Sequence, residues 1–333
     1  MSGRTFRALV VEETQENKFA RTIKERPIDD LPAGDVLIRV HYSSMNYKDA
    51  LSATGNRGVT KNYPHTPGVD AAGIVEESAS GGLKPGEEVL VTGYDLGANT
   101  SGGYGGYIRV PADWVVKLPR GLSLRESMVY GTAGFTAALS VYKMEEHGVD
   151  PKMGEVLVTG ATGGVGSIAS GILAKSGYDV VASTGKTDQK QFLTDLGVKE
   201  VISREDAKDS SGKPLLKARW AGVVDTVGGE ILVTAIKSAR QHGIVTCCGN
   251  VASADLPLNI YPFILRGVSL VGIDSAYCPM DIRKKVWDKI ANEWKIEKLD
   301  IISTEISLDG LDEHIELILQ GKQKGRVVVN LMK

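Results

Sequence analysis

The chain has few cysteines, no long apolar run and no recognisable leader. Its three cysteines are Cys247, Cys248 and Cys278, and none belongs to a C-x-x-C pair. Three cysteines cannot build a disulfide framework or a structural Cys₄ zinc site. No stretch approaches the roughly 18 apolar residues of a membrane span, and the N-terminal apolar run is too short for a signal peptide. We therefore expect a protein of the reducing cytoplasm without a membrane partner.

The chain also has almost no excess of charge of either sign, and it has few aromatic residues. Lys and Arg number 39 against 41 Asp and Glu, and aromatic residues make up 6%. This leaves no basic footprint for nucleic acid and few side chains on which bases could stack. Glycine is abundant instead, with 39 of 333 residues, against a usual share of ~7%. The length predicts about two domains, and the glycines indicate tight turns and backbone that approaches another group closely.

The pattern of short runs changes along the chain. The first ~120 residues carry short β-branched runs between Gly and Pro, which predicts a small barrel or sandwich. Ser123 and Glu126 have the spacing of a capping box that opens a helix. After Asp150-Pro151, strands and helices alternate, which predicts a doubly wound parallel α/β sheet. The last helix and strand, at 311–320 and 326–331, cannot bury themselves, so we expect them to return to the first domain.

A glycine-rich loop between a strand and a helix is the strongest chemical signal. The run 159–166 reads T-G-A-T-G-G-V-G and follows the apolar strand 156–159. Read as G-x-G-x-x-G, its first position is Ala161, and Gly163 and Gly166 are in place. Such a loop lets backbone N–H groups and a helix N-terminus approach a pyrophosphate. The loop therefore predicts a dinucleotide-binding Rossmann unit.

The end of the next strand points to the type of dinucleotide. An NAD site of this kind places a carboxylate there, whereas this chain has Thr184, Gly185 and Lys186. A hydroxyl and an ammonium favour a 2′-phosphate, so we expect NADPH rather than NADH. Arg204, after the third strand, is a second candidate ligand for that phosphate. The alternative is that Lys186 is only a solvated residue at a helix start.

Seven motifs together resemble a known family over essentially the whole chain. They are N-Y-K-D at 46–49, P-G-V-D at 67–70, G-T-A-G-F-T-A at 131–137, the loop at 160–166, V-D-T-V-G at 224–228, P-F-I-L-R at 262–266 and G-R-V-V-V at 325–329. In this order they resemble the medium-chain dehydrogenase/reductase superfamily. The first, third and sixth resemble its zinc-independent branch of acryloyl-CoA reductases, whose members are also labelled quinone oxidoreductases.

The resemblance implies a domain organisation and an assembly. Residues 1–123 and 275–333 are expected to form a GroES-like catalytic domain, and residues 124–274 a Rossmann domain that binds NADPH. The resemblance also implies a homodimer whose Rossmann sheets join edge to edge through the strand around Val268–Ile273. The reaction is then expected in the cleft between the two domains.

The resemblance also assigns roles to individual residues. Tyr47 is expected to line the nicotinamide pocket. The other expected cofactor contacts are Thr162, Gly163, Gly164 and Val165 at the pyrophosphate, Thr184, Gly185 and Lys186 at the 2′-phosphate, Arg204 at the adenosine end, Asn250, Ile264 and Ser275 around the nicotinamide half, and Arg326 from the returning tail. Two positions depart from the family pattern: Lys186 stands where Arg is common, and Asn250 replaces an apolar residue.

No set of metal ligands is visible. The zinc enzymes of the superfamily have Cys where Asn46 falls and Gly-His-Glu where Gly68-Val69-Asp70 stands. His41 and His65 are isolated and fit no zinc spacing. We therefore expect no metal.

A metal-free site favours reduction of a C=C bond conjugated to a carbonyl over alcohol oxidation. The resemblance makes acryloyl-CoA, converted to propionyl-CoA, the expected substrate. Tyr47 is the candidate catalytic residue, as a hydrogen-bond or proton donor or as a packing residue. Asn46 and Asp49 are interpreted as fixing a loop, and Cys247-Cys248 as core. The alternatives are an NADPH:quinone oxidoreductase and a non-catalytic NADPH-binding protein.

Overall fold

The computed structural model describes residues 3–333 and divides them into two compact units. The first unit comprises Met1–Thr132, Ala276–Ala291 and Ile302–Lys333, and the second comprises Ala133–Ser275 and Asn292–Ile301. The sequence analysis put the boundaries at 123/124 and 274/275. In the part of the chain described, no helix has the length and apolar character needed to cross a membrane.

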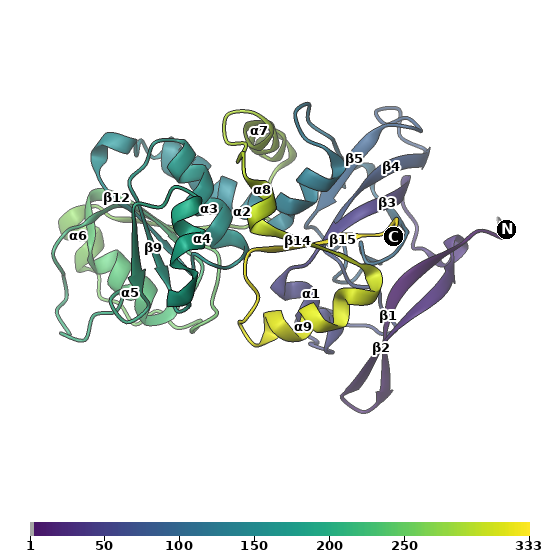
Figure 1. Cartoon of the computed structure of the whole chain (residues 1–333), viewed down its shortest axis with the longest axis horizontal. Coiled ribbons are helices and arrows are strands. Elements are labelled where there is room, and N and C mark those ends of the chain that lie inside the picture. The colour runs from purple at the N-terminus through teal and green to yellow at the C-terminus, as the bar shows by residue number, and fades with distance from the viewer. Residues whose placement is uncertain (1–2) are drawn as a thin grey trace. The chain divides into compact units, whose positions relative to one another are not determined.

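The first unit is built on a mixed sheet that combines both ends of the chain (Figure 1). The C-terminal strand pairs antiparallel with β3, with Val328 opposite Ser44, so the tail does return to this unit as the sequence predicts. The strands in spatial order are β14 (Ser303–Ser307), β15 (Arg326–Asn330), β3 (Val36–Ser44), β4 (Asp70–Ser78), β5 (Glu88–Thr92) and β7 (Val116–Lys117), with β6 (Tyr107–Val110) also on β3. Inward-facing Val and Ile side chains of these strands form the core.

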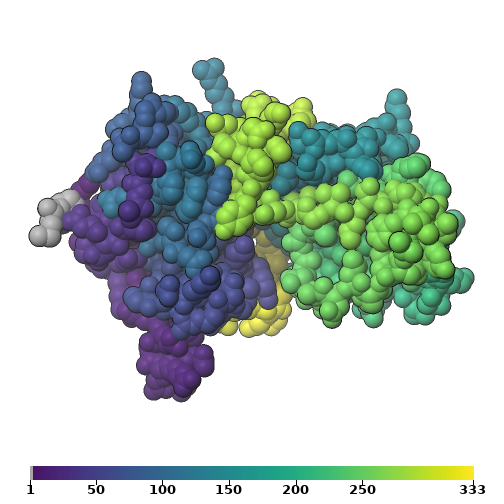
Figure 2. All heavy atoms as spheres, turned by 180° about the vertical axis from the view of Figure 1, so that it is seen from behind, coloured from purple at the N-terminus to yellow at the C-terminus, as the bar shows by residue number. Residues whose placement is uncertain are grey.

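A separate hairpin precedes that sheet. It consists of β1 (Thr5–Gln15) and β2 (Lys18–Pro27) in antiparallel register. Its tip stands out from the body of the first unit in both views (Figures 1 and 2). The charged, half-exposed strand β2 has no apolar run, and the sequence analysis did not predict it.

Three helices complete the first unit, together with the start of a fourth. They are α1 (Tyr47–Ala53), α7 (Met280–Ala291) and α9 (Leu311–Leu319), with the first part of α2 (Leu124–Glu146). Leu311 and Ile315 of α9 pack in one core cluster with Ala50 of α1 and Val329 of β15. Figure 2 shows the yellow-green segment that includes α7 against the blue atoms of earlier residues of this unit. Because α1 begins at Tyr47, the motif at 46–49 opens a helix.

Helix α2 confirms the predicted capping box and contains a break. The backbone N–H of Ser123 donates to Glu126 Oε2 at 2.8 Å, and the N–H of Glu126 donates to Ser123 Oγ at 3.2 Å. Gly131 has φ 50° and ψ −156°, which interrupts the helical path. A Cβ there would meet Ser44 Oγ at 2.4 Å and Asp70 Oδ2 at 2.5 Å, so the break needs glycine. The helix predicted to open at the capping box therefore continues beyond this kink to Glu146.

The second unit is a parallel six-stranded sheet between helices. The strand order is β10 (Glu200–Ser203), β9 (Val180–Thr184), β8 (Val156–Thr159), β11 (Trp220–Asp225), β12 (Ala239–Cys247) and β13 (Ser269–Gly272). Figure 1 shows helices on both sides, namely α3 (Gly164–Lys175) and α4 (Lys190–Asp195) on one and α5 (Gly229–Lys237) and α6 (Tyr261–Arg266) on the other. The short helix α8 (Leu299–Ile302) lies where the chain passes from the second unit back to the first.

The strand order defines where a ligand binds in such a sheet. The chain moves from β8 to β9 and β10 on one side, and β11 lies on the other side of β8. Open parallel sheets bind ligands beyond the carboxyl ends of the strands at this switch point. The glycine-rich loop follows β8 directly, so it lies at that point. The doubly wound α/β fold predicted from the sequence is therefore confirmed.

Candidate active site

The glycine-rich loop leaves backbone donors open at the start of α3. Gly163 is the N-cap and supplies no side-chain cap. The N–H of Ser167 donates to Gly163 O at 3.0 Å, whereas the N–H groups of Gly164, Val165 and Gly166 find no acceptor within residues 3–333. Open N–H groups at the positive end of a helix dipole bind anions. The loop therefore fits a pyrophosphate.

Two glycines of the loop are required by packing, and one leaves space. A Cβ at Gly166 would lie 2.4 Å from Gly160 O, and one at Gly160 would lie 2.3 Å from Thr226 Oγ1. A Cβ at Gly163 would meet only Gly160 O, at 3.2 Å. Gly160 and Gly166 thus let β8, β11 and α3 meet closely, and Gly163 keeps the loop surface free for a ligand.

Hydroxyls and cations lie together where β9 and β10 end. Thr162 Oγ1 and Thr184 Oγ1 are 3.0 Å apart, and the N–H of Lys186 donates to Thr184 Oγ1 at 3.0 Å. The Arg204 guanidinium lies across Gly185, where a Cβ would be 2.9 Å from Nη2. Burial, and to a lesser degree Arg204, lowers the pKa of Lys186. Two cations beside a hydroxyl fit a phosphate monoester next to the pyrophosphate loop.

Asp225, at the end of β11, holds the following loop in place through hydrogen bonds. Its carboxylate accepts from Thr159 Oγ1 at 2.7 Å and from the N–H groups of Gly228 at 2.8 Å and Val227 at 3.3 Å. Burial raises its pKa. Cys248 donates to Asp225 O at 3.4 Å, and burial raises the pKa of its thiol to about 12. A thiol whose ionisation is disfavoured in this way is a poor nucleophile.

Tyr47 is an exposed aromatic residue on a tightly held helix start. It is the first residue of α1, and 47% of it is exposed. The N–H of Asn46, the N-cap, donates to Asp49 Oδ2 at 2.8 Å. Asp49 Oδ1 in turn accepts from the N–H of Val69 at 2.8 Å. These bonds fix the backbone on both sides of Tyr47 while its ring remains accessible.

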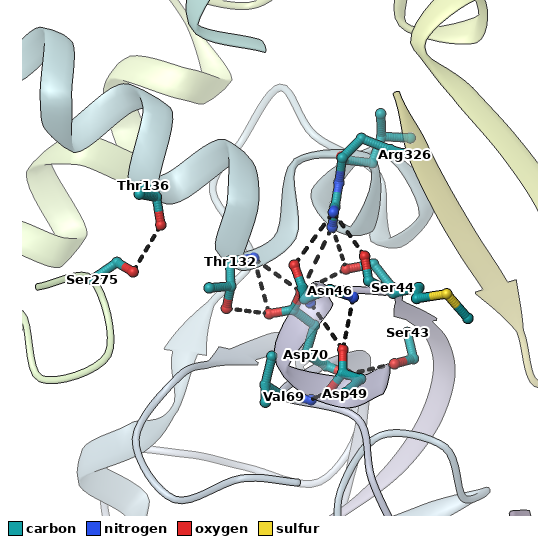
Figure 3. A network of polar contacts seen from close by, with 12 residues as sticks. Ser43, Ser44, Asn46, Asp49, Val69, Asp70, Thr132, Thr136, Ser275 and Arg326 are labelled. Atoms are coloured by element: carbon teal, nitrogen blue, oxygen red, sulfur yellow. Dashed lines mark hydrogen bonds and ion pairs between the residues drawn. The ribbon is translucent and has the colours of Figure 1, made fainter. Parts of the chain in front are cut away.

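Asp49, Asp70 and Arg326 form a buried charged cluster beneath that helix start (Figure 3). Asp70 accepts from Ser44 Oγ at 2.5 Å, Asn46 Nδ2 at 2.7 Å, Thr132 N at 2.9 Å and Thr132 Oγ1 at 2.6 Å. Arg326 donates to Met45 O at 2.8 Å, Ser44 Oγ at 2.8 Å, Val129 O at 3.1 Å and Asn46 Oδ1 at 3.3 Å. The cluster thereby joins β3, α1, β4, the kink in α2 and β15.

The cluster holds two carboxyl groups and one guanidinium. Asp49 and Asp70 are fully buried, and Arg326 is 2% exposed, with Nη2 3.8 Å from Asp70 Oδ2. Burial, aided by the charge of Asp70, raises the pKa of Asp49 to about 7. Asp49 therefore carries a proton for part of the time near neutral pH. That proton brings the cluster close to electrical balance.

Two of the expected cofactor residues lie at positions that do not fit a contact with the cofactor. Arg326 is in the interior of the first unit, where four protein oxygens accept its N–H groups. Ile264 lies on α6, near the amino end of β12, because Arg266 Nη1 donates to Ala239 O at 3.0 Å and Gln241 Nε2 to Leu265 O at 3.3 Å. The phosphate loop is at the opposite edge of the sheet. Neither position supports the cofactor contact that the resemblance implied.

Two further expected residues lie at the carboxyl edge. Asn250 follows the end of β12 and is exposed. Ser275 follows β13, and its hydroxyl accepts from Thr136 Oγ1 at 2.7 Å (Figure 3). Both positions stay compatible with the expected nicotinamide contacts. Thr136 was not identified from the sequence, although it belongs to the motif at 131–137.

Asn46 and Asp70, at positions where zinc enzymes of the superfamily have metal ligands, form a hydrogen bond with each other. Asn46 Nδ2 donates directly to Asp70 Oδ2, so the amide and the carboxylate satisfy each other. Within residues 3–333, no group of three or more His, Cys, Asp or Glu side chains has the geometry to hold a metal ion.

A GroES-like unit closed by a returning C-terminal strand, combined in one chain with a second unit whose parallel sheet carries a glycine-rich phosphate loop, defines the medium-chain dehydrogenase/reductase class. Family models agree: residues 32–120 match "Alcohol dehydrogenase GroES-like domain" and residues 164–292 match "Zinc-binding dehydrogenase". Relatives that match over nearly their full length point to a smaller group within this class. The chain is 47% identical to "Putative quinone oxidoreductase YhfP" of Bacillus subtilis and 42% identical to "Acrylyl-CoA reductase AcuI" of Ruegeria pomeroyi, in each case over 98% of this chain and 99% of the relative.

Solved structures that resemble this chain are oxidoreductases or relatives of the same group. The yhdH oxidoreductase of Salmonella enterica in complex with NADP has a TM-score of 0.95 and 40% identity, over 97% of this chain and 99% of that one. Bacillus subtilis yhfP with NAD bound has a TM-score of 0.96 and 46% identity, over 98% and 100%. The chain therefore belongs to the medium-chain dehydrogenase/reductase family, in the group that contains these acrylyl-CoA reductases and quinone oxidoreductases.

Proposed function

We propose that the protein is an NADPH-dependent oxidoreductase that reduces the C=C bond of a small α,β-unsaturated carbonyl compound, with acryloyl-CoA as the substrate and propionyl-CoA as the product. The observation that carries the proposal is the pair of cations beside the phosphate loop in a chain 40–42% identical to proteins named acrylyl-CoA reductase. We also propose that the first unit is the GroES-like catalytic domain and the second unit the NADPH-binding domain.

The cofactor is held by the second unit in this proposal. The N–H groups of Gly164, Val165 and Gly166 bind the pyrophosphate, with Thr162 and Gly163 lining the loop. Thr184, Gly185, Lys186 and Arg204 bind the 2′-phosphate, and Asn250 and Ser275 lie toward the nicotinamide. When bound, NADPH supplies the hydride that adds to the β-carbon. A Salmonella relative crystallised with NADP and an Escherichia coli relative crystallised with NADPH, each 40% identical, support this choice.

Tyr47 is proposed as the residue that contacts the substrate. During hydride addition, charge develops on the carbonyl oxygen of the substrate, and a phenol that donates a hydrogen bond there stabilises the transition state. The cluster beneath α1 holds Tyr47 in place and so reduces the entropic cost of that contact. A packing role for the ring is the alternative. Tyr47→Phe separates the two: loss of the hydroxyl lowers kcat with little change in NADPH affinity only if the hydroxyl acts in the transition state.

The decisive experiment follows label and rate with purified protein. With NADPH deuterated at the transferable 4-position, the deuterium is expected at the β-carbon of propionyl-CoA, and the α-hydrogen is expected from solvent. Steady-state rates with acryloyl-CoA and with a simple quinone are compared under the same conditions. A kcat/KM for the quinone far above that for every enoyl thioester contradicts the proposal.

A quinone reductase is the second candidate function. It is favoured by the 47% identity to a relative whose name carries that activity. A third candidate, a non-catalytic NADPH-binding protein, predicts tight NADPH binding without turnover of any enoyl thioester, enone or quinone. The same panel of acceptors therefore distinguishes all three.

We further propose a cytoplasmic homodimer joined through β13. This strand ends the order of the six-stranded sheet, so one of its edges is unpaired within the chain described. Exposed apolar side chains accompany it, among them Ile260, Ile264 and Leu265. An open strand edge with apolar neighbours is what an edge-to-edge dimer would cover. The mass in solution, and its fall to that of a monomer in Leu270→Pro, test this assembly. Cys247, Cys248 and Cys278 take part in no disulfide within residues 3–333, which fits a reducing compartment.

A further inference from the structure

The first unit contains a cavity with no part in the site described above. Its volume is ≈ 400 Å³. The lining residues are Tyr94, Ala112, Asp113, Trp114, Val115, Met280 and Lys284. They come from the loop after β5, from the segment before β7 and from α7. All of these lining residues belong to the first unit, whereas the phosphate loop belongs to the second.

A stack of aromatic rings forms one wall of this cavity. The rings of Tyr94 and Trp114 are parallel within 1°, with centroids 5.3 Å apart. Tyr277 meets the edge of Tyr94 at 6.3 Å. On Tyr94 also lies the buried guanidinium of Arg283, with Cζ 4.5 Å from the ring centroid. The wall is therefore a rigid aromatic surface supported by a cation from the interior.

The backbone of Tyr94 is held in an unusual conformation to make this wall. Its φ is 52°, a left-handed value that a bulky residue rarely adopts. The N–H of Tyr94 donates to Ala276 O at 3.0 Å, and Arg283 donates to Ala276 O at 3.0 Å and to Thr92 O at 2.8 Å. Strain that is held in place by several bonds is frequent at ligand sites.

The charges of the cavity are one cation and one anion. Lys284 on α7 and Asp113 before Trp114 are both exposed. An aromatic face beside an ammonium is the chemistry that recognises a nucleobase bearing a phosphate. Of these two groups, only the ammonium of Lys284 can pair with a phosphate.

The cavity is linked to Tyr47 by two hydrogen bonds. Gly93, the neighbour of Tyr94, donates its N–H to Val69 O at 3.0 Å. The N–H of Val69 donates to Asp49 on α1 at 2.8 Å, and Tyr47 begins that helix. The segment that carries Tyr94 and the helix start that carries Tyr47 are therefore joined through Val69 within the first unit.

We propose that this cavity binds the adenosine 3′-phosphate end of coenzyme A, with the adenine on Trp114 and the phosphate at Lys284. The inference rests on the proposed function, because it takes the substrate to be a CoA thioester. It names the residues that would distinguish that thioester from a small enone or quinone. A free adenine nucleotide shares the recognised chemistry and is separated from CoA in the test.

The kinetic test compares a full and a truncated substrate. Trp114→Ala and Lys284→Ala are each expected to raise KM for acryloyl-CoA roughly tenfold and to leave KM for acryloyl-N-acetylcysteamine, which lacks the nucleotide, unchanged. Trp114→Phe keeps a ring and is expected to recover part of the loss. Lys285→Ala, on the same helix but not in the lining, is the matched control and is expected to behave as wild type. Equal effects on both substrates would overturn the proposal.

A binding test keeps the proposal independent of turnover. Trp220, Trp287 and Trp294 are buried and Trp114 is only half-buried, so a ligand on its ring is expected to quench its fluorescence. Saturable quenching by CoA and by adenosine 3′,5′-bisphosphate, lost in Trp114→Phe, supports the site. Adenosine 2′,5′-bisphosphate that quenches equally well would reassign the cavity to free nucleotides. If no thioester is turned over but CoA still quenches Trp114, the proposed function fails and the site stands. If CoA does not quench Trp114, the site fails.

Discussion

The phosphate loop and the buried charged cluster show two different ways of building a functional region. The loop is contiguous, from Gly160 to Gly166, and it acts through backbone N–H groups and the helix dipole. The cluster draws Ser44, Asn46, Asp49, Asp70, Thr132 and Arg326 from separate elements and acts through side chains. A contiguous backbone site leaves a glycine pattern in the sequence, whereas a side-chain cluster exists only after folding.

The two regions also differ in energetic cost. Open N–H groups at a helix start are solvated in the free protein, so the loop costs little stability. Two carboxyl groups and a guanidinium have lost their water in the cluster, and only mutual pairing offsets that loss. Substitutions in the cluster should therefore change the free energy of unfolding, and substitutions in the loop should change binding.

Removing the only cation of the cluster should have the largest effect. In Arg326→Met the two fully buried carboxyl groups lose their counter-charge, and four protein oxygens lose a donor. Such a loss typically costs about 3–5 kcal/mol of the free energy of unfolding. Urea unfolding followed by circular dichroism measures it.

Arg125→Met is the matched control for that prediction. Arg125 Nε lies 2.8 Å from Glu305 Oε2 in the same unit, but both side chains are partly exposed. A pair of this kind contributes below about 1 kcal/mol. Equal losses for the two variants would show that the cluster is not held by its buried charge, and the contrast between the two regions would disappear.

The pH dependence of stability should also come from the cluster. The pKa of Asp49 is raised from 3.8 to about 7, so the native state binds this proton more tightly than the unfolded state. The native state is then favoured at low pH, and its stability falls as the pH rises from about 4 to about 7. The fall is on the order of 2–4 kcal/mol, since one pKa unit corresponds to ~1.4 kcal/mol.

Asp49→Asn should remove that part of the pH dependence. Unfolding free energies at pH 5 and pH 8 are compared for wild type, Asp49→Asn and the exposed control Asp309→Asn. The difference between the two pH values is expected to shrink in Asp49→Asn and to persist in the control. A profile for Asp49→Asn that parallels wild type would place the titrating proton elsewhere.

Local signals explain what the sequence predicted well. The loop, the doubly wound sheet and the capping box of Ser123 and Glu126 depend on residues close in the chain. The strand β2 was missed because its charged residues show no apolar alternation, and only its register with β1 makes it a strand. Helix α1 was missed because its seven residues are few for a periodic pattern.

Long-range pairing explains what could not be predicted. Asp70 and Arg326 are 3.8 Å apart in the structure but lie in motifs at opposite ends of the chain. The sequence analysis interpreted Asn46 and Asp49 as fixing a loop, and the resemblance assigned Arg326 to the cofactor, because nothing local indicates which buried charges will meet. The kink at Gly131 was not predicted, because its cause, the contact with Ser44 and Asp70, lies outside the motif at 131–137.

In the loop, a single added methyl group should weaken NADPH binding while leaving the fold intact. A Cβ at Gly166 would lie 2.4 Å from Gly160 O and 2.7 Å from Ala161 Cα, both backbone atoms that cannot yield cheaply. Gly166→Ala is expected to displace the loop and to weaken NADPH binding by roughly a hundredfold, equivalent to about 2.7 kcal/mol. Gly82→Ala, whose Cβ would meet only Ser80 Oγ at 3.8 Å, is the control. NADPH fluorescence titration measures both, and unchanged affinity in Gly166→Ala would show that binding does not depend on the loop conformation that Gly166 allows.

The smallest expected effect is the loss of cofactor affinity when Lys186 is replaced. This residue is expected to decide between NADPH and NADH. One relative was crystallised with NADP and another with NAD, so the class alone does not fix the choice. Lys186 lies beside Thr184 and Arg204, and a single charged hydrogen bond to phosphate contributes about 1.5–3 kcal/mol. Lys186→Ala is therefore expected to weaken NADPH binding roughly tenfold or more and to leave NADH binding unchanged. Lys199→Ala is the control, since Lys199 pairs with Asp179 at the amino end of β9, 2.6 Å away. Equal losses for NADPH and NADH in Lys186→Ala would mean that Lys186 shapes the loop without reading the 2′-phosphate, and the preference for NADPH would then rest on Arg204.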